Sequence, residues 1–339
     1  MKKYTLFIGI DISKSWIDVS LTLDGQKASM LHRRFANREK SFVKMQKWIA
    51  AFSKKHQVCS EQWLFCMEHT GVYTLPLSFF LEKHDYDYVV ESALRIKRSN
   101  GLKRGKDDKT DSKDIARYAF LFQKGLKISK LPSQAILQLK DLMAYRDRLI
   151  KQCNALKVPV KEAKTTIGRH FLQDICDDTE DLVELYKKKI RKAEKLIKSI
   201  IDAHERLKDV YDLATSVKGI GMISAVQFII HTRCFEAFDD HRKFACYISI
   251  APFAQQSGSR MDRPAKVSPL GHKKLKAILT NAALSAIQHN KELRAYYQKK
   301  LKQGKNKYSV LNAVKNKLVS YVFATVKRGT AFVERCNYA

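Results

Sequence analysis

The chain has 339 residues, enough for two or three domains. An apolar fraction of 45% with few prolines and glycines predicts a folded, helix-rich protein and excludes a disordered chain. Its 64 lysines and arginines against 34 aspartates and glutamates leave a formal net charge of +30. This excess indicates a nucleic-acid partner, because phosphates release counterions when basic side chains bind them. An anionic membrane surface is the weaker alternative, since no long basic amphipathic helix with a Trp/Phe face is evident.

Seven scattered cysteines, never spaced as C-x-x-C, indicate reduced, mostly buried thiols rather than disulfides or a zinc site. The N-terminus starts like a signal peptide, but Asp11 interrupts its apolar run and no small-residue cleavage site follows. No apolar run approaches the length of a membrane helix. We therefore expect a soluble, cytoplasmic protein without a membrane partner.

The first part of the chain alternates strand and helix patterns. Three strands are expected first, then a helix after Asn37, and then strands and helices in turn. The expected strands are 4–11, 16–23, 28–35, 62–67 and 86–91, and the expected helices are 42–52, 73–83 and 110–124. The order βββαβαβα predicts a mixed sheet with covering helices.

Acidic residues lie where this pattern would bring them to one end of a sheet. Asp11 ends the first predicted strand, and Glu68 ends the fourth. An aspartate that ends an apolar strand must be paired, hydrogen-bonded or bound to a metal if it is buried. Asp111 and Asp114 are three residues apart on helix 110–124, so they share a face and can hold one divalent cation. Each acid taken alone is more often a helix cap or a solvated charge.

Other acids compete for the same roles. Asp107 and Asp108 are alternatives to Asp111, and Glu61 is a weaker alternative to Glu68 because it precedes its strand. The basic approach to the aspartate pair, beside acids suited to a metal, indicates phosphodiester chemistry.

From Leu131-Pro132 onward the composition changes. Apolar residues recur every three and four positions from Leu139 to Leu156 and again from Leu182 to Leu207, with a break near Pro159 and Gly168. This spacing predicts two long helices with a coiled-coil-like seam. An intramolecular hairpin and a dimerisation arm are equal alternatives.

The third part of the chain, from about residue 211, is predicted to be mainly helical. Gly219-Ile-Gly221 is expected to form a tight turn between two helices, either to present backbone N–H groups to a phosphate or to allow close helix packing. Residues 251–260 are expected to form a turn-rich loop that contains Ser257. Arg260 and Lys266 lie near it as candidate phosphate ligands. On these residues alone Ser257 is a plain loop serine, and no Ser–His–Asp triad is evident.

The chain joins an N-terminal D…E…K-T-D-x-x-D pattern to a C-terminal G-I-G…P-x-x-x-x-S-G…G-x-x-x-L-x-x-x-L-x-x-A-A pattern over about residues 5–290. This combination resembles the DEDD insertion-sequence transposases that carry a C-terminal serine, the bridge-RNA-guided recombinases. The acids of that family correspond here to Asp11, Glu68, Asp111 and Asp114, which would bind Mg²⁺ (or Mn²⁺). Its nucleophilic serine corresponds to Ser257.

The resemblance implies an α/β RNase H-like domain, similar to Holliday-junction resolvases, over 1–130, with its first and fourth strands adjacent. An α-helical coiled-coil linker would follow over 131–210, and a mainly α-helical transposase domain with the serine loop over 211–339. The implied enzyme is a DNA transposase or recombinase that cuts and rejoins donor and target DNA, directed by a structured guide (bridge) RNA. It would act as a homo-oligomer, a dimer or tetramer, with acids and serine meeting between protomers.

This chain departs from the family pattern in three places. The family often has Ala-Gly-Leu where this chain has Ser249-Ile250-Ala251, and it tends to have Gly-Asn and Leu-Arg where this chain has Gly271-His272 and Leu275-Lys276. None of these departures removes a candidate catalytic residue.

Basic residues near the candidate sites are expected to contact nucleic-acid backbone. They are Arg95, Lys97, Arg98, Lys103, Arg104, Arg260, Lys266, Lys273 and Lys274. Two other functions fit parts of the pattern. A metal-dependent Holliday-junction resolvase or nuclease needs only the four acids, and a non-catalytic nucleic-acid-binding protein needs only the charge.

Overall fold

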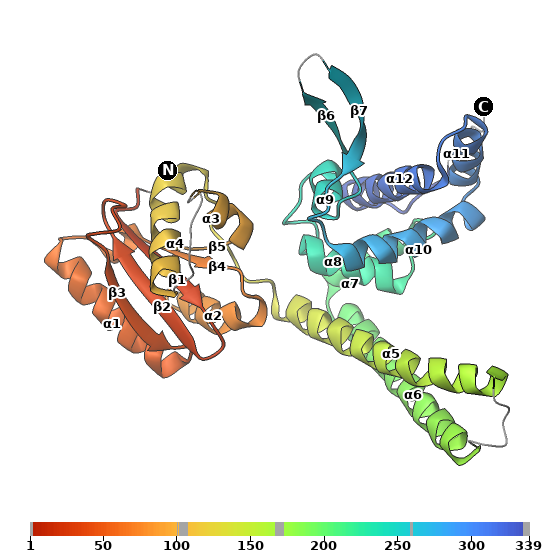
Figure 1. Ribbon diagram of the computed structural model, residues 1–339, viewed down its shortest axis with the longest axis horizontal. Coiled ribbons are helices and arrows are strands. Elements are labelled where there is room, and N and C mark those ends of the chain that lie inside the picture. Colours follow the sequence, from red (N-terminus) through yellow and green to blue (C-terminus); the bar gives the residue numbers. More distant parts are fainter. Residues whose placement is uncertain (1–2, 100, 102–107, 167–172, 258–259, 335–339) are drawn as a thin grey trace. The chain divides into compact units, whose positions relative to one another are not determined.

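The structure is a computed structural model that describes residues 3–99, 101, 108–166, 173–257 and 260–334 (Figure 1). Within these ranges the side chains of residues 108–109, 163–164, 166, 173, 254–257 and 260–266 are not described. The chain divides into two compact units, Met1–Leu131 and Pro132–Ala339, and each is treated by itself. No helix in the described ranges combines the length and the apolar character needed to span a membrane.

The first unit contains a five-stranded mixed sheet in the order β3-β2-β1-β4-β5. β1 pairs antiparallel with β2 and parallel with β4, so the expectation that the first and fourth strands are neighbours is confirmed. β3 pairs antiparallel with β2, and β5 parallel with β4. The strands are β1 Leu6–Ile12, β2 Trp16–Thr22, β3 Leu31–Ala36, β4 Trp63–Glu68 and β5 Tyr88–Glu91.

Helices cover both faces of this sheet, which is why its central strands are almost continuously apolar. α1 (Glu39–Lys55) and α2 (Leu75–Lys83) share one core with the side chains of Leu6, Ile8 and Ile10. α3 (Ala93–Ser99) and α4 (Asp108–Phe122) share the opposite core with the side chain of Phe7 and its neighbours. Short 3₁₀ turns lie at Ser60–Gln62, Gly71–Thr74 and Gln123–Gly125.

Gly9 allows α4 to lie directly against β1. A Cβ atom at this position would lie 2.1 Å from the backbone nitrogen of Ala116 and 2.3 Å from the carbonyl oxygen of Ser112. Only a residue without a side chain permits this close contact between helix and strand. Gly9 therefore determines how close the start of α4 comes to the sheet.

The second unit begins with two long helices, α5 (Gln134–Thr166) and α6 (Gln173–Asp202), which pack side by side as an arm (Figure 1). The break expected near Pro159 and Gly168 lies later than Pro159, because α5 continues through this proline to Thr166 and α6 begins at Gln173; Gly168 lies outside the described residues. The second predicted helix also ends earlier than expected, at Asp202. Leu207 belongs to α7 (Glu205–Ser216), and the apolar spacing continues across the junction because both helices contribute to one core.

The remaining helices form a bundle around a second apolar core. They are α8 Met222–Thr232, α9 His241–Tyr247, α10 Lys273–His289, α11 Lys291–Lys302 and α12 Lys307–Arg328. Gly219, with a φ of +100°, lies against α10, where a Cβ would come within 2.6 Å of the Ala286 Cβ. The alternative that this glycine serves close packing is therefore supported. Gly221 begins α8 as its N-cap, and a Cβ there would meet no atom within 4 Å.

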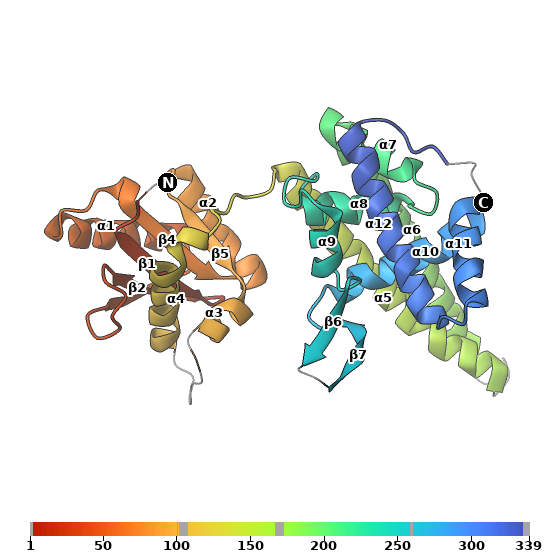
Figure 2. The ribbon, with the colours of Figure 1, turned by 90° about the horizontal axis from the view of Figure 1, so that it is seen from above.

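The expected loop over residues 251–260 is wrong. The segment belongs to a two-stranded antiparallel hairpin, β6 (Pro252–Ser257) and β7 (Arg260–Val267), which extends from the helical bundle (Figure 1 and Figure 2). Its prolines, glycine and polar residues give no alternation of apolar and polar positions, the signal by which a strand is detected. Backbone pairing between the two strands, rather than an apolar face, defines this element.

Candidate catalytic site

Two of the predicted acids lie at the same end of the sheet. Asp11 is the penultimate residue of β1, and Glu68 is the last residue of β4. The parallel register places Ile10 opposite Met67, so the next residues on both strands are neighbours and point to the same face. Both side chains are partly exposed. This is the face of Gly9, on which α4 packs.

The start of α4 lies at this acidic end of the sheet. Gly9 lies under Ser112, whereas Phe7, farther from Asp11, contacts Phe120 with ring centroids 5.4 Å apart. The helix therefore runs opposite to β1, and its first turns lie toward the ends of β1 and β4. Asp111 belongs to these turns and is partly exposed.

Asp114 lies one turn further along α4 and is buried. Its carboxylate forms an ion pair with Lys27, which lies between β2 and β3. The structure thus places Asp111 in the first turns of α4, which lie toward the strand ends, and couples Asp114 to a lysine. Asp108 is the first residue of α4 but its side chain is not described, and Asp107 lies outside the described residues. Glu61 precedes β4, at the opposite end of that strand from Glu68.

The acids fit a hard cation through their chemistry. Within the described residues no three His, Cys, Asp or Glu side chains gather as a preformed metal cage. Mg²⁺ is commonly held by only one or two carboxylates, with substrate phosphates completing its octahedral shell. Adjacent oxygen donors from Asp11 and Glu68 satisfy this requirement.

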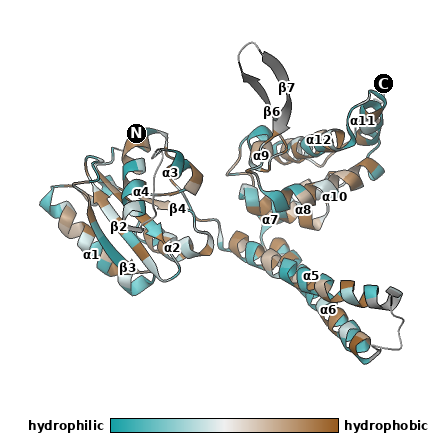
Figure 3. Cartoon of the chain, viewed as in Figure 1, coloured by the Kyte–Doolittle hydropathy of each residue, from teal (hydrophilic) through white to brown (hydrophobic). Residues whose placement is uncertain are grey.

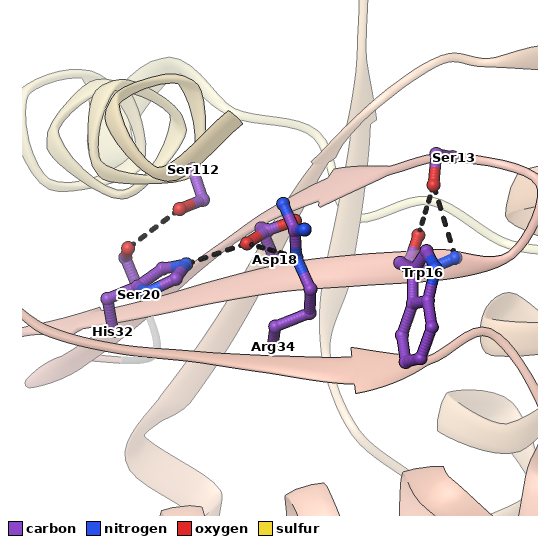
Figure 4. A network of polar contacts seen from close by, with 7 residues as sticks. All are labelled: Ser13, Trp16, Asp18, Ser20, His32, Arg34 and Ser112. Carbon is purple, nitrogen blue, oxygen red and sulfur yellow. Dashed lines mark hydrogen bonds and ion pairs between the residues drawn. The ribbon is translucent and has the colours of Figure 1, made fainter. Parts of the chain in front are cut away.

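A further acid, Asp18, lies directly beside Asp11 and was not among the predicted site residues. The register of β1 and β2 pairs Asp11 with Asp18, which is 4% exposed. His32 Nε2 lies 2.8 Å from its carboxylate, and the Arg34 guanidinium donates to both of its oxygens at 3.1 and 3.0 Å (Figure 4). The signal was available in the sequence, because Asp18 alternates with the apolar Ile17 and Val19 of its strand.

On the same face of the sheet, a hydrogen bond between two serine hydroxyls joins β2 to α4. Ser20 and Ser112 lie 2.8 Å apart and are both buried (Figure 4). Together with Gly9, this contact holds the helix turn that follows Asp111 against the sheet.

Glu91 extends the row of acids on the other side. It ends β5, pairs with Glu68 in register and is 8% exposed. Its carboxylate accepts hydrogen bonds from the Tyr118 hydroxyl at 3.0 Å and from Arg95 at 2.9 Å. Burial and the hydrogen bond to Glu91 raise the pKa of Tyr118 to about 12, so this phenol remains a donor. Four carboxylates thus cross four neighbouring strands, and cationic or phenolic partners bind the outer two.

Ser257 is the last residue of β6 and pairs in register with Arg260 of β7. Lys266, the other predicted phosphate ligand, pairs with Phe253 at the base of the same hairpin. The serine belongs to the second unit and the acids to the first. The structure therefore groups the acids with one another and groups Ser257 with Arg260.

The predicted nucleic-acid contacts fall into three groups. Lys97 and Arg98 are exposed on α3, whereas Arg95 is bound to Glu91. Lys273 and Lys274 begin α10, and Lys274 forms an ion pair with Asp147 of α5. The third group lies on β7 and comprises Arg260 and Lys266, while Lys103 and Arg104 lie outside the described residues.

Comparison with known proteins agrees with this arrangement. A transposase family model of the DEDD type found in IS110 elements matches residues 8–168, and a model described as transposase IS116/IS110/IS902 family matches residues 211–298. Pilin gene-inverting proteins of Moraxella bovis and Moraxella lacunata are each 22% identical to the chain over 337 residues, covering 98% of both sequences.

The acids at one end of the sheet, the helical second unit and these matches define a DNA recombination enzyme of the transposase class. More specifically, residues 8–168 and 211–298 match transposase domain models of the IS110 family.

Proposed function

We propose that the chain is the transposase of an insertion sequence, and that it cuts and rejoins donor and target DNA with Asp11, Glu68, Asp111 and Asp114 as its acids and Ser257 as its nucleophile. The observation that carries the proposal is the juxtaposition of Asp11 and Glu68 beneath the start of α4. The strand order β3-β2-β1-β4-β5 supports an RNase H-like fold similar to that of Holliday-junction resolvases.

The acids would bind a divalent cation. Mg²⁺ or Mn²⁺ on these oxygen ligands supplies positive charge that stabilises the negative charge on phosphate oxygens during strand cleavage. Asp11 and Glu68 are the best placed ligands, and Asp111 is the first acid of α4 whose side chain is described.

Ser257 would preserve the energy of the phosphodiester bond. Its hydroxyl loses a proton to a base and attacks phosphorus, and the new Oγ–P bond replaces one backbone P–O bond while the departing sugar oxygen takes up a proton. The reverse exchange with a hydroxyl of another strand rejoins the DNA and releases the serine. Because a serine hydroxyl is a poor nucleophile at neutral pH, the acids and the serine must meet in one site. We propose that they meet between protomers of a dimer or tetramer.

A structured bridge RNA encoded by the element would direct the enzyme. Base pairing by the RNA then provides sequence specificity, and the protein binds backbone and RNA shape. The net charge of +30 supports two polyanionic partners. Deleting the RNA is expected to abolish recombination at the chosen target, and changing its guide segment is expected to move the target. Unchanged targeting without RNA would contradict this part of the proposal.

A second candidate is site-specific inversion of a DNA segment, favoured by the relatives named pilin gene-inverting proteins, which match the chain over its full length. Both functions use the same cleavage and rejoining chemistry. A plasmid assay that distinguishes inversion of a segment from its insertion elsewhere separates them.

The serine is tested by trapping the covalent intermediate. In Ser257→Ala, covalent protein–DNA adducts are expected to disappear, whereas Ser259→Ala, two residues further along the chain, is expected to retain them. DNA adducts that survive Ser257→Ala would contradict the assignment. Cleavage without any rejoining, in the unchanged protein, would instead favour a resolvase or nuclease.

The acids are tested by a matched pair of substitutions, one at each end of β4. Glu68→Gln is expected to lower the rate of DNA cleavage by about 10²-fold or more, because it removes a charged oxygen ligand beside Asp11. Glu61→Gln, at the other end of the strand, is expected to leave the rate unchanged. An unchanged rate of DNA cleavage in both Glu68→Gln and Asp11→Ala would contradict the assignment of these acids, and no cleavage by the unchanged protein would favour a nucleic-acid-binding role alone.

A further inference from the structure

A cationic cluster lies between α10 and α12, outside the acidic site. Lys315, in the middle of α12, is only 6% exposed, and its Nζ donates a hydrogen bond to Thr280 Oγ1 of α10 at 3.4 Å. Lys276 lies one turn before Thr280, whose hydroxyl donates in turn to the Lys276 carbonyl at 2.9 Å. Burial, followed by the nearby charge of Lys276, lowers the pKa of Lys315 to about 8. At neutral pH Lys315 therefore still carries its charge.

Within the described part of the chain, neither Lys276 nor Lys315 forms an ion pair with an acidic side chain. Lys274 of α10, in contrast, pairs with Asp147. A buried ammonium group costs free energy unless an anion or several hydrogen bonds compensate it. A single hydrogen bond of 3.4 Å at Lys315 is weak compensation. The cluster is therefore arranged for an anion that comes from outside the chain.

The cluster adjoins the base of the hairpin that carries Ser257. Asn312 lies three residues before Lys315, on the same face of α12, and its Nδ2 donates to the carbonyl oxygen of Ile250 at 2.7 Å. Ile250 lies two residues before the start of β6. A nucleic-acid strand that passes along this hairpin would thus bring a backbone phosphate within reach of α10 and α12.

We propose that Lys276, Thr280 and Lys315 form a binding site for one phosphodiester group of the nucleic acid on which the enzyme acts. The phosphate oxygens accept charge-assisted hydrogen bonds from both lysines and offset their mutual repulsion. The proposal rests on the function as a nucleic-acid recombinase, but it requires neither the serine nucleophile nor a metal. DNA and RNA share this backbone chemistry, and separate probes distinguish them.

The experiment measures binding and stability together in the Ser257→Ala background, so that cleavage does not intervene. Lys315→Met keeps an unbranched apolar chain but removes the charge. Its melting temperature without nucleic acid is expected to equal or exceed that of the parent, because an uncompensated buried charge is gone. Its affinity is expected to fall roughly three- to tenfold, and the dependence of log K on log salt to decrease by about one unit. Lys327→Met, at the exposed C-terminal end of α12, is the matched control.

The probes are a labelled DNA duplex and a labelled RNA hairpin. A loss with DNA alone assigns the phosphate to DNA, and a loss with RNA alone assigns it to RNA. Lys276→Met is expected to reproduce the loss, and the double variant to add little, because both lysines bind one phosphate. Unchanged affinity for both probes, an equal loss in Lys327→Met, or a lower melting temperature with normal binding would overturn the proposal.

Discussion

Carboxylates at the end of the first sheet lie side by side because strand register determines the neighbour of each one. Asp18, Asp11, Glu68 and Glu91 occupy successive strands on one face. Adjacent like charges destabilise a sheet unless partners compensate them. His32 and Arg34 compensate Asp18, and Arg95 compensates Glu91. Asp11 and Glu68 are the two central acids of the row, between the compensated Asp18 and Glu91.

Gly9 is the residue on which the approach of α4 depends. Gly9→Ala is expected to lower the free energy of unfolding by about 1–3 kcal/mol and to displace the start of α4, because the new Cβ would overlap helix backbone rather than a flexible side chain. Urea unfolding measures the first effect, and the rate of DNA cleavage measures the second. Gly125→Ala, where a Cβ meets no atom within 4 Å, is expected to change stability by less than about 0.5 kcal/mol. Equal effects of the two substitutions would contradict this account.

At the scale of elements, a partly exposed cluster of His231, Tyr247 and His272 joins α8, α9 and the start of α10. His231 Nδ1 lies 3.0 Å from the Tyr247 hydroxyl, and its ring lies 4.5 Å from that of His272. The His272 side chain caps α10 by accepting from the Leu275 backbone N–H at 3.1 Å. Burial, followed by the charges of His272, Lys140 and Lys274, lowers the pKa of His231 to about 4.

This shift predicts a pH-dependent stability of the second unit. Because the folded pKa of His231 lies below its unfolded value of 6.5, the unfolded chain binds the proton more tightly between these values. Stability is therefore complete above pH 6.5 and is lost as the pH falls toward 4, by roughly 2 kcal/mol for this group. His231→Gln is expected to flatten this part of the profile in thermal unfolding. A profile identical to that of the parent would show that other groups cause the loss.

At the scale of the whole molecule, the arm of α5 and α6 offers a surface for self-association. The helices pack on each other, and Arg146 of α5 binds Glu194 of α6 at 2.7 Å, which supports the intramolecular hairpin. Apolar residues nevertheless occur along the arm, where Figure 3 colours them brown among hydrophilic ones, and the side chains of Leu182 and Leu185 are 46% and 50% exposed. A hairpin alone does not require these exposed leucines, so we expect the arm to bind a second copy.

The expected result is that Leu182→Glu with Leu185→Glu lowers the mass measured by sedimentation to that of a monomer, because two charges would enter an apolar interface. Leu284→Glu is the control, since Leu284 is 45% exposed on α10. Recombination is expected to fall with the oligomer if acids and serine meet between protomers. An unchanged mass would restrict the arm to its intramolecular role.

The amino-acid sequence alone was sufficient to predict the mixed sheet, the helical second part and Asp11 and Glu68 at their strand ends, because apolar periodicity and terminal acids are local signals. The adjacency of the first and fourth strands was expected only from the family resemblance. Tertiary structure decided the rest. Only strand pairing reveals that Asp18 and Glu91 flank the predicted acids, and only helix packing couples Asp114 to Lys27 and buries Lys315 beside Lys276. The serine segment lacks a periodic apolar face, so its hairpin depends on pairing between strands that local sequence does not encode.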